Sequence, residues 1–194
     1  MSKRAPFEIV GECIAAGTRK TVRIPVSTLS DHTPVAIAAH VIHGKREGPC
    51  MFVSAGIHGD EVIGVEIVRR LLRSDPLVNL RGTLIVVPIV NTFGFLNHSR
   101  YLPDRRDLNR CFPGSPHGSL ASRLAHIFLS EIVARCTIGI DLHSAAVHGW
   151  HIVSDTSWAG YREMPLNIMA GYSVIGREAI AQMQGAGPSH CFLP

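Results

Sequence analysis

The stretch CMFVSAGIHGDEVIGVEIVRRLLR, Cys50–Arg73, combines the patterns that decide the fold class. Its first part, Cys50–Gly56, is a continuous apolar run, which is typical of a central strand covered on both faces. Its last part, Glu61–Arg73, repeats apolar residues at helical spacing, and Asp60 is the expected N-cap. Glycines between the two parts permit a tight turn. The stretch therefore predicts a buried strand that leads directly into a helix.

The rest of the chain repeats this alternation of strand and helix patterns. Apolar or alternating runs predict further strands at Thr21–Ser27, Val35–Gly44, Gly82–Asn91 and Thr137–Ser144. A polar loop at Thr92–Pro116 precedes a second helix at Ser119–Cys136, with Ser119 as its N-cap. Pro88 must lie near the end of its strand or at a bulge, because proline cannot donate to a strand ladder. This order predicts an α/β fold with a largely parallel core, in which the two earliest strands form an antiparallel edge.

Length and composition indicate a single globular domain. The chain has 194 residues, of which 46% are hydrophobic and 18% charged, which is ordinary for a folded protein and wrong for disorder. No apolar run reaches the ~18 residues of a membrane span, and the N-terminus carries no signal-peptide pattern. The five cysteines form no C-x-x-C pair, so we expect free thiols and a cytoplasmic location.

The formal net charge of +4 and the pI of about 9.0 raise the question of nucleic-acid binding. The basic residues form no long tract, however. Four arginines alternate with two aspartates in one cluster: Arg100, Asp104, Arg105, Arg106, Asp107 and Arg110. A small anionic substrate explains this cluster better than a phosphate backbone does. Arg105 and Arg106 are interpreted as ion-paired residues of a solvated loop, and no nucleic-acid partner is expected.

Three residues with metal-ligand chemistry follow predicted strand ends. His58 and Glu61 come just after the strand at Cys50–Gly56, and His143 lies at the carboxyl end of the last predicted strand. Ligands of open α/β sheets bind outside the carboxyl ends of strands, and two histidines with one glutamate are typical of a catalytic zinc site. The alternative is that His58 and Glu61 are capping or surface groups. Spacing leaves both interpretations open, since His143 is distant in sequence.

Two nearby residues have their own alternatives. Asp141 precedes His143 by two residues, so on a strand both side chains point to the same side. It is expected either to orient that histidine or to accept hydrogen bonds from backbone N–H groups at the strand end. His126 lies inside the second helical pattern and is interpreted as a packed or surface histidine.

Three motifs occur in order: GIHGDE at residues 56–61, DLNRCFPG at 107–114 and DLHSA at 141–145. Together they resemble the succinylglutamate desuccinylase/aspartoacylase family, a branch of the zinc carboxypeptidase-like fold, over roughly residues 20–148. The resemblance implies one zinc ion held by His58, Glu61 and His143, and an N-acyl amino acid substrate. It also implies that Asn109 and Arg110 contact the substrate carboxylate. Arg100, in the pair Arg100-Tyr101, is implied to stabilise the developing oxyanion, although this pair lies further from DLNR than in aspartoacylase.

The sequence departs from the family pattern after His143. Family members carry a catalytic glutamate well beyond the last zinc histidine and then a β-rich part that shapes the substrate pocket. Here only Glu163 and Glu178 follow, and neither lies at a recognised strand end. We therefore expect a zinc-carboxypeptidase-like part at residues 1–148 and a divergent tail at 149–194, which includes a short helical pattern at Arg177–Met183.

This departure predicts a truncated chain, with a frameshift as one interpretation of the tail, and no general-base glutamate. The first functional hypothesis is a zinc-dependent hydrolase of the amide bond of a small N-acyl amino acid, impaired in this short chain. The alternative is a catalytically inactive fragment or relative that keeps the metal site.

Overall fold

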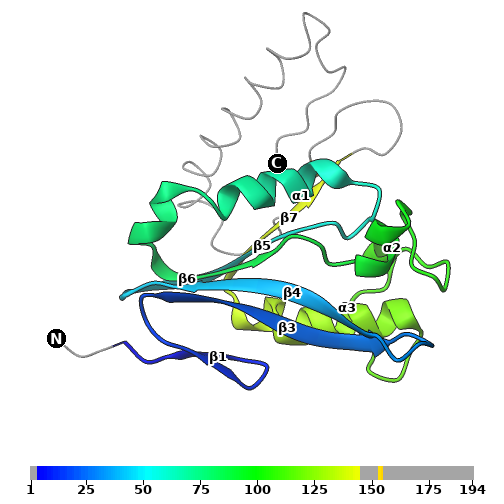
Figure 1. Ribbon diagram of the computed structural model, residues 1–194, viewed down its shortest axis with the longest axis horizontal. Helices are drawn as coiled ribbons and strands as arrows, with labels where there is room; N and C mark the ends of the chain where they lie inside the picture. The colour runs from blue at the N-terminus through cyan, green and yellow to red at the C-terminus, as the bar shows by residue number, and fades with distance from the viewer. Residues whose placement is uncertain (1–3, 145–152, 155–194) are drawn as a thin grey trace, which may run out of the picture.

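The structure, a computed structural model, describes residues 4–144 and 153–154. Within these residues, no helix combines the length and the apolar character that a membrane crossing requires. The chain forms an α/β arrangement with one mixed sheet between two layers (Figure 1).

The main sheet has the strand order β3-β4-β6-β5-β7-β8. Its strands are β3 Thr18–Thr28, β4 Pro34–His43, β5 Arg46–Ala55, β6 Arg81–Val87, β7 Ile138–His143 and β8 Val153–Ser154. Strand β5 pairs in parallel with both β6 and β7, whereas the β3–β4, β4–β6 and β7–β8 pairs are antiparallel. The predicted parallel core and antiparallel early edge are therefore confirmed.

The two faces of the sheet are covered by different elements. Helix α1 (Val62–Leu71) lies on one face, and helix α3 (Leu120–Glu131) lies on the other, together with the hairpin of β1 (Phe7–Ile9) and β2 (Glu12–Ile14) (Figure 1). The remaining short elements are α2 Thr92–Leu96 and the 3-10 turns η1 Asp75–Asn79, η2 Leu108–Arg110 and η3 Val133–Arg135.

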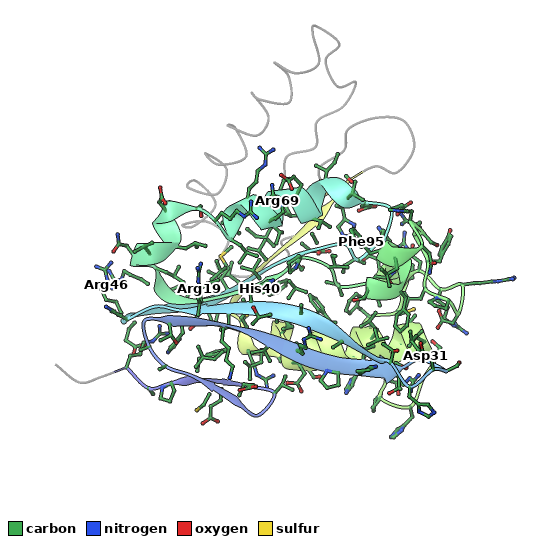
Figure 2. All side chains as sticks on the ribbon, in the orientation of Figure 1. Arg19, Asp31, His40, Arg46, Arg69 and Phe95 are labelled. Atoms are coloured by element: carbon green, nitrogen blue, oxygen red, sulfur yellow. The ribbon has the colours of Figure 1, made fainter. Side chains whose placement is uncertain are left out.

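Side chains fill the space on both sides of the sheet (Figure 2). On the α3 side, Ile37 and Ile85 of the sheet pack in one buried cluster with Leu124 of the helix. On the α1 side, Val53 of β5 packs in a second cluster with Val68 of the helix. The sheet lies between these two clusters, which explains why the later part of β5, from Cys50 to Ala55, and most of β6 are apolar on both faces.

Helix α1 lies close to the sheet because it carries Gly64 on its inner face. A Cβ atom at Gly64 would lie 3.0 Å from the Cβ of Leu142 and 3.1 Å from the Cβ of Ala55. Contacts this tight leave almost no room for a larger side chain. The start of α1, which carries Glu61, is thereby held over the carboxyl ends of β5 and β7.

The turn between β5 and α1 is fixed by glycines at two points. Gly56 has a φ of 65°, a conformation that favours glycine, and its carbonyl accepts a hydrogen bond of 2.8 Å from the N–H of Asn91. Gly59 packs directly on the backbone of Gly94, so any side chain there would clash. Its N–H also donates to the carbonyl of Ser99 at 3.1 Å. The loop that carries His58 is thus anchored to helix α2.

Some local predictions were right. The Oγ of Ser119 accepts a hydrogen bond from the N–H of Ser122, so Ser119 is the N-cap of α3. Pro88 directly follows the last residue of β6, as the missing N–H of proline requires.

Other local predictions were wrong. Asp60 does not cap α1, because Glu61 occupies the N-cap position and makes no side-chain capping hydrogen bond. The expected loop at Thr92–Pro116 contains α2 and η2, whose short lengths hide their periodicity. Strand β5 begins at Arg46, four residues before the expected start at Cys50, and its pairing with β6 shifts register between these two residues. The helix at Arg177–Met183 and the boundary at residue 148 lie outside the described residues.

Candidate metal centre

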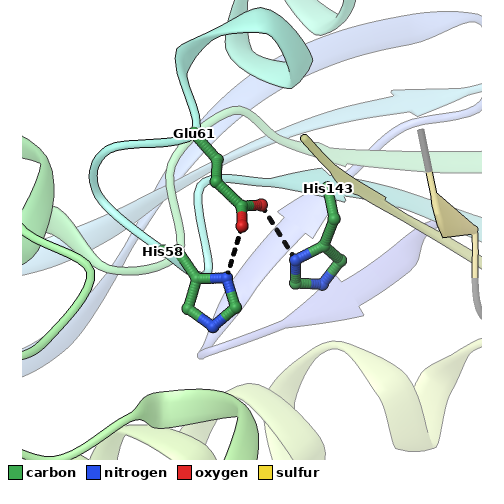
Figure 3. Close-up of side chains that lie close together, drawn as sticks. All are labelled: His58, Glu61 and His143. Carbon is green, nitrogen blue, oxygen red and sulfur yellow. Dashed lines mark hydrogen bonds and ion pairs between the residues drawn. The ribbon is translucent and has the colours of Figure 1, made fainter. Parts of the chain in front are cut away.

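The structure brings His58, Glu61 and His143 together at one edge of the sheet (Figure 3). His58 lies in the turn after β5, Glu61 directly precedes α1, and His143 is the last residue of β7. Because β5 and β7 are parallel neighbours, their carboxyl ends meet at the same edge. One donor atom from each of the three side chains lies within 4.8 Å of the other two.

The carboxylate of Glu61 lies between the two imidazole rings. Its Oε1 is 2.8 Å from Nδ1 of His58, and its Oε2 is 3.0 Å from Nδ1 of His143. Oε2 also accepts a hydrogen bond of 2.9 Å from the N–H of Ser144. Glu61 is only 5% exposed and His58 only 2%, so water contributes little to their solvation.

The other ring nitrogen of each histidine contacts a second carboxylate. Nε2 of His58 is 3.0 Å from Oδ1 of Asp107, and Nε2 of His143 is 2.7 Å from Oδ2 of Asp141. The other oxygen of Asp141 accepts a hydrogen bond of 2.7 Å from the hydroxyl of Ser54. Of the two roles considered for Asp141, these contacts favour orientation of the histidine.

This pattern settles where the ring protons belong. An ionised carboxylate only accepts hydrogen bonds, so the Nε2 atoms that face Asp107 and Asp141 must carry hydrogen. In a neutral imidazole, Nδ1 is then a bare acceptor, and both Nδ1 atoms face acceptor oxygens of Glu61. A positively charged species, either a proton on Nδ1 or a metal ion, has to lie between them. The donor set therefore fits a metal ion bound through His58 Nδ1, Glu61 and His143 Nδ1.

The pKa values of His143 and Glu61 reflect this arrangement. Burial alone would lower the pKa of His143, but hydrogen bonds to Asp141 and Glu61 outweigh burial and raise it to about 10. Burial alone would raise the pKa of Glu61, but hydrogen bonds from His143, His58 and the Ser144 N–H lower it to about 2. The site thus holds ionised carboxylates that a bound cation can neutralise.

Arg100 lies beside this group. Its Nε donates to Oδ2 of Asp107 at 3.1 Å, and its NH1 lies 3.6 Å from Oε1 of Glu61. About a third of its side chain, 36%, is exposed. A guanidinium so placed is available to a negatively charged group that approaches from solvent.

Asn109 and Arg110 belong to η2, which follows Asp107. Both are exposed, and their side chains make no hydrogen bond or ion pair within residues 4–144. Their contact with a substrate carboxylate stays a prediction. Glu163 and Glu178 lie outside the described residues. Arg106 lies 3.9 Å from Asp104, as expected for an ion-paired loop residue.

Sequence reasoning missed the role of Asp107. This residue joins three parts of the site, because it accepts from His58, from Arg100 and, through Oδ1, from the N–H of Asn109 at 2.9 Å. The bonds from His58 and the charge of Arg100 outweigh burial and lower the pKa of Asp107. Its place as the first residue of the DLNR motif was the available signal.

Two histidines and a glutamate at the carboxyl ends of parallel strands, with an aspartate behind each histidine, are typical of a metal-dependent hydrolase. Residues 47–189 match the model of the succinylglutamate desuccinylase/aspartoacylase catalytic domain. The chain belongs to this family. The match ends later than residue 148, where the motifs alone placed the end of the resemblance.

The chain is similar to several known proteins. The chain is 30% identical over 124 residues to an N-alpha-acetyl-L-2,4-diaminobutyric acid deacetylase from Halomonas elongata, a match that covers 63% of this chain and 36% of the relative. A succinylglutamate desuccinylase/aspartoacylase structure from Rhodobacter sphaeroides is 33% identical with a TM-score of 0.60, covering 68% of this chain and 40% of that one.

A third match is of another reaction class. Diaminopropionate ammonia-lyase from Escherichia coli (strain K12) is 41% identical over 87 residues, which is 40% of this chain and 22% of the lyase. The chain thus spans well under half the length of each of these relatives.

Proposed function

We propose that this chain carries the zinc site of a hydrolase that cleaves the amide bond of a small N-acyl amino acid in the cytoplasm. The observation that carries the proposal is the orientation of the two histidines. Each turns Nδ1 towards Glu61 and Nε2 towards an aspartate, which is an arrangement typical of metal-binding histidines.

The proposal gives each residue a chemical task. Bound zinc would lower the pKa of its water towards about 7 and polarise the scissile carbonyl. Asp107 and Asp141 hold the rings of His58 and His143 in the tautomer that leaves Nδ1 free. Arg100, beside Glu61, stabilises negative charge that develops on the carbonyl oxygen.

The acidic end of the substrate is assigned to Asn109 and Arg110. Both side chains are exposed next to Asp107, and a guanidinium can hold a carboxylate through two parallel hydrogen bonds, which lysine cannot match. Arg110→Lys should therefore weaken binding of an acidic ligand more than the matched change Arg105→Lys. Equal effects of the two changes on the dissociation constant would remove Arg110 from the substrate site.

The proton acceptor for the attacking water is not assigned. A positioned general base typically contributes ~10²–10⁴-fold, so turnover at the usual ~1–10³ s⁻¹ would require one. The alternative function is metal binding without turnover.

The first arm of the test measures metal content. Elemental analysis of the zinc-dialysed chain should find about one zinc per molecule. His143→Ala should lose this zinc, whereas the control His126→Ala, which changes a histidine of α3, should keep it. Equal zinc content in both variants would exclude the metal site.

The second arm measures hydrolysis. N-alpha-acetyl-L-2,4-diaminobutyric acid leads the panel because the Halomonas elongata relative is named for it, followed by N-succinylglutamate and N-acetylaspartate. Slow release of amine that a chelator stops would support the hydrolase. Bound zinc without any release would favour the inactive alternative, and release at ~1–10³ s⁻¹ would show that the chain is not impaired.

A further inference from the structure

Two cysteines meet at the end of the sheet that lies away from the metal residues. Cys50 lies in β5, and Cys136 directly follows the turn η3, shortly before β7 begins. Their Sγ atoms are 3.5 Å apart, although the residues are 86 positions apart in sequence. Within residues 4–144, the other two cysteines have no sulfur neighbour: the thiol of Cys13 faces Glu8, and that of Cys111 faces the carbonyl of Asp107.

The backbone beside this pair is fixed. The N–H of Thr137 donates to the carbonyl of Cys50 at 2.8 Å, and the Thr137 hydroxyl donates to the same carbonyl at 3.1 Å. The next residues, Met51 and Ile138, are partners in the parallel β5–β7 ladder. To form a disulfide, the sulfurs would have to close from 3.5 Å to ~2.05 Å.

We propose that Cys50 and Cys136 form a reversible disulfide when the chain meets a small-molecule disulfide such as oxidised glutathione. The thiolate of Cys50 attacks one glutathione sulfur, forms a mixed disulfide and releases the other glutathione as a thiolate. The thiolate of Cys136 then attacks Cys50 Sγ and releases the second glutathione. Two electrons pass from the cysteine pair to the glutathione disulfide, and the two thiol protons end on the two glutathiones.

Further features support Cys50 as the first nucleophile. Both cysteines are free, and both residues are only partly buried. A hydrogen bond from the Cys136 thiol lowers the pKa of Cys50, and the guanidinium of Arg4 lowers it further, against the opposing effect of burial. The same hydrogen bond and burial raise the pKa of Cys136. Thiolate character is what makes a cysteine reactive.

The disulfide would cross-link β7 to β5. The crossover between these strands includes η2 and α3, and β7 ends at His143. Cys50 precedes the carboxyl end of β5 by five residues, or about 16 Å of strand, so the disulfide would lie well away from the metal residues. Oxidation should therefore stabilise the strand that carries His143 without contact with the site itself.

The first test uses the whole purified chain and oxidised glutathione, followed by alkylation of remaining thiols and peptide mapping by mass spectrometry. The expected product is a peptide pair that joins Cys50 to Cys136 and lacks two hydrogen atoms. It should also form in the control Cys13→Ser and disappear on addition of dithiothreitol. In Cys50→Ser and Cys136→Ser, the remaining thiol should carry glutathione instead.

A second measurement reads the effect on stability. The oxidised wild-type chain should melt about 5–10 °C higher than the reduced chain, and Cys50→Ser should show no such shift. Alkylation of both Cys50 and Cys136 after oxidation, while Cys13 carries glutathione, would overturn the proposal. So would a Cys50–Cys136 link that forms only after unfolding in urea.

Discussion

The apolar body of the main sheet and the charged edge where β5 and β7 end differ sharply within a few residues. In the body, Val53 and Ile140 are buried against α1 and need no hydrogen-bonding partner. At the edge, Glu61 and His143 are charged in the metal-free protein and are held by hydrogen bonds to one another. One pair of strands thus serves two purposes, which are separable by mutation.

The two regions contribute differently to the stability of the protein. Burial of apolar side chains stabilises the fold, at roughly 25 cal/mol per Å² removed from water. Burial of charged groups costs free energy unless hydrogen bonds or a cation compensate. The edge holds three carboxylates around two imidazoles, those of Glu61, Asp107 and Asp141. Such an arrangement is better suited to binding a cation than to stabilising the fold.

The largest effect on stability is expected from the body. Ile85 of β6 is fully buried, so Ile85→Ala should reduce the free energy of unfolding by about 2–5 kcal/mol through lost burial and a cavity. Urea unfolding followed by circular dichroism measures this loss. Ile85→Ala should still bind zinc under conditions in which it is folded. Ile85→Val is a milder control, which should reduce the free energy of unfolding by about 0.5–1.5 kcal/mol. Lost zinc binding in folded Ile85→Ala would show that the two regions are not separable.

Substitutions at the charged edge should change the affinity for zinc. Asp141→Asn keeps the size of the side chain but weakens the contact to Nε2 of His143, so zinc affinity should fall about 10–100-fold. Asp107→Asn should have an effect of similar size through His58. Competition with a chromogenic chelator measures both. Asp31→Asn, in an exposed turn, is the matched control. An equal loss of zinc affinity in this variant would mean that Asp107 and Asp141 do not act by orienting the histidines.

Much of the body was predictable from sequence because its signals are local. The apolar run at Cys50–Gly56 and the helical spacing after it predicted β5 and α1, and the strand patterns predicted the antiparallel edge. The hairpin β1–β2 was not predicted, since strands of three residues show no measurable alternation. Helix α2 was missed for the same reason, because its five residues are too few for a helical period to show.

The edge was less predictable because its contacts are distant in sequence. His58 and Glu61 were found from one motif, but their closure with His143 depends on the parallel pairing of β5 and β7. The contact of Asp107 with His58 spans 49 positions, and no local pattern reports it. Strand-end position predicted the candidate ligands and a possible role for Asp141, whereas only the folded arrangement shows Asp107 behind His58.

The two predicted helix N-caps differ in the same way. Ser119 was predicted correctly, and Asp60 was not. Ser119→Ala removes the hydrogen bond to the Ser122 N–H and should cost about 0.5–2 kcal/mol of unfolding free energy. Asp60→Ala should cost less, because Asp60 makes no capping bond and its Oδ1 is buried without a partner. Urea unfolding of the metal-free proteins compares the two. A greater cost for Asp60→Ala would mean that the carboxylate stabilises α1 without a direct bond.

The smallest effect is expected from a histidine of the body, His40 of β4. Burial lowers its pKa below the ordinary value near 6.5, and its Nδ1 lies 2.9 Å from the Thr21 hydroxyl. Above pH 6.5 the ring is neutral in both the folded and the unfolded chain, so it contributes no pH dependence. As the pH falls from 6.5 towards the folded pKa, the unfolded chain binds the proton first, and stability is lost. His40→Gln should remove this part of the loss. The melting temperature of the variant relative to that of the wild type should therefore be higher at pH 5 than at pH 8. A difference that stays constant over this range would mean that His40 titrates alike in both states.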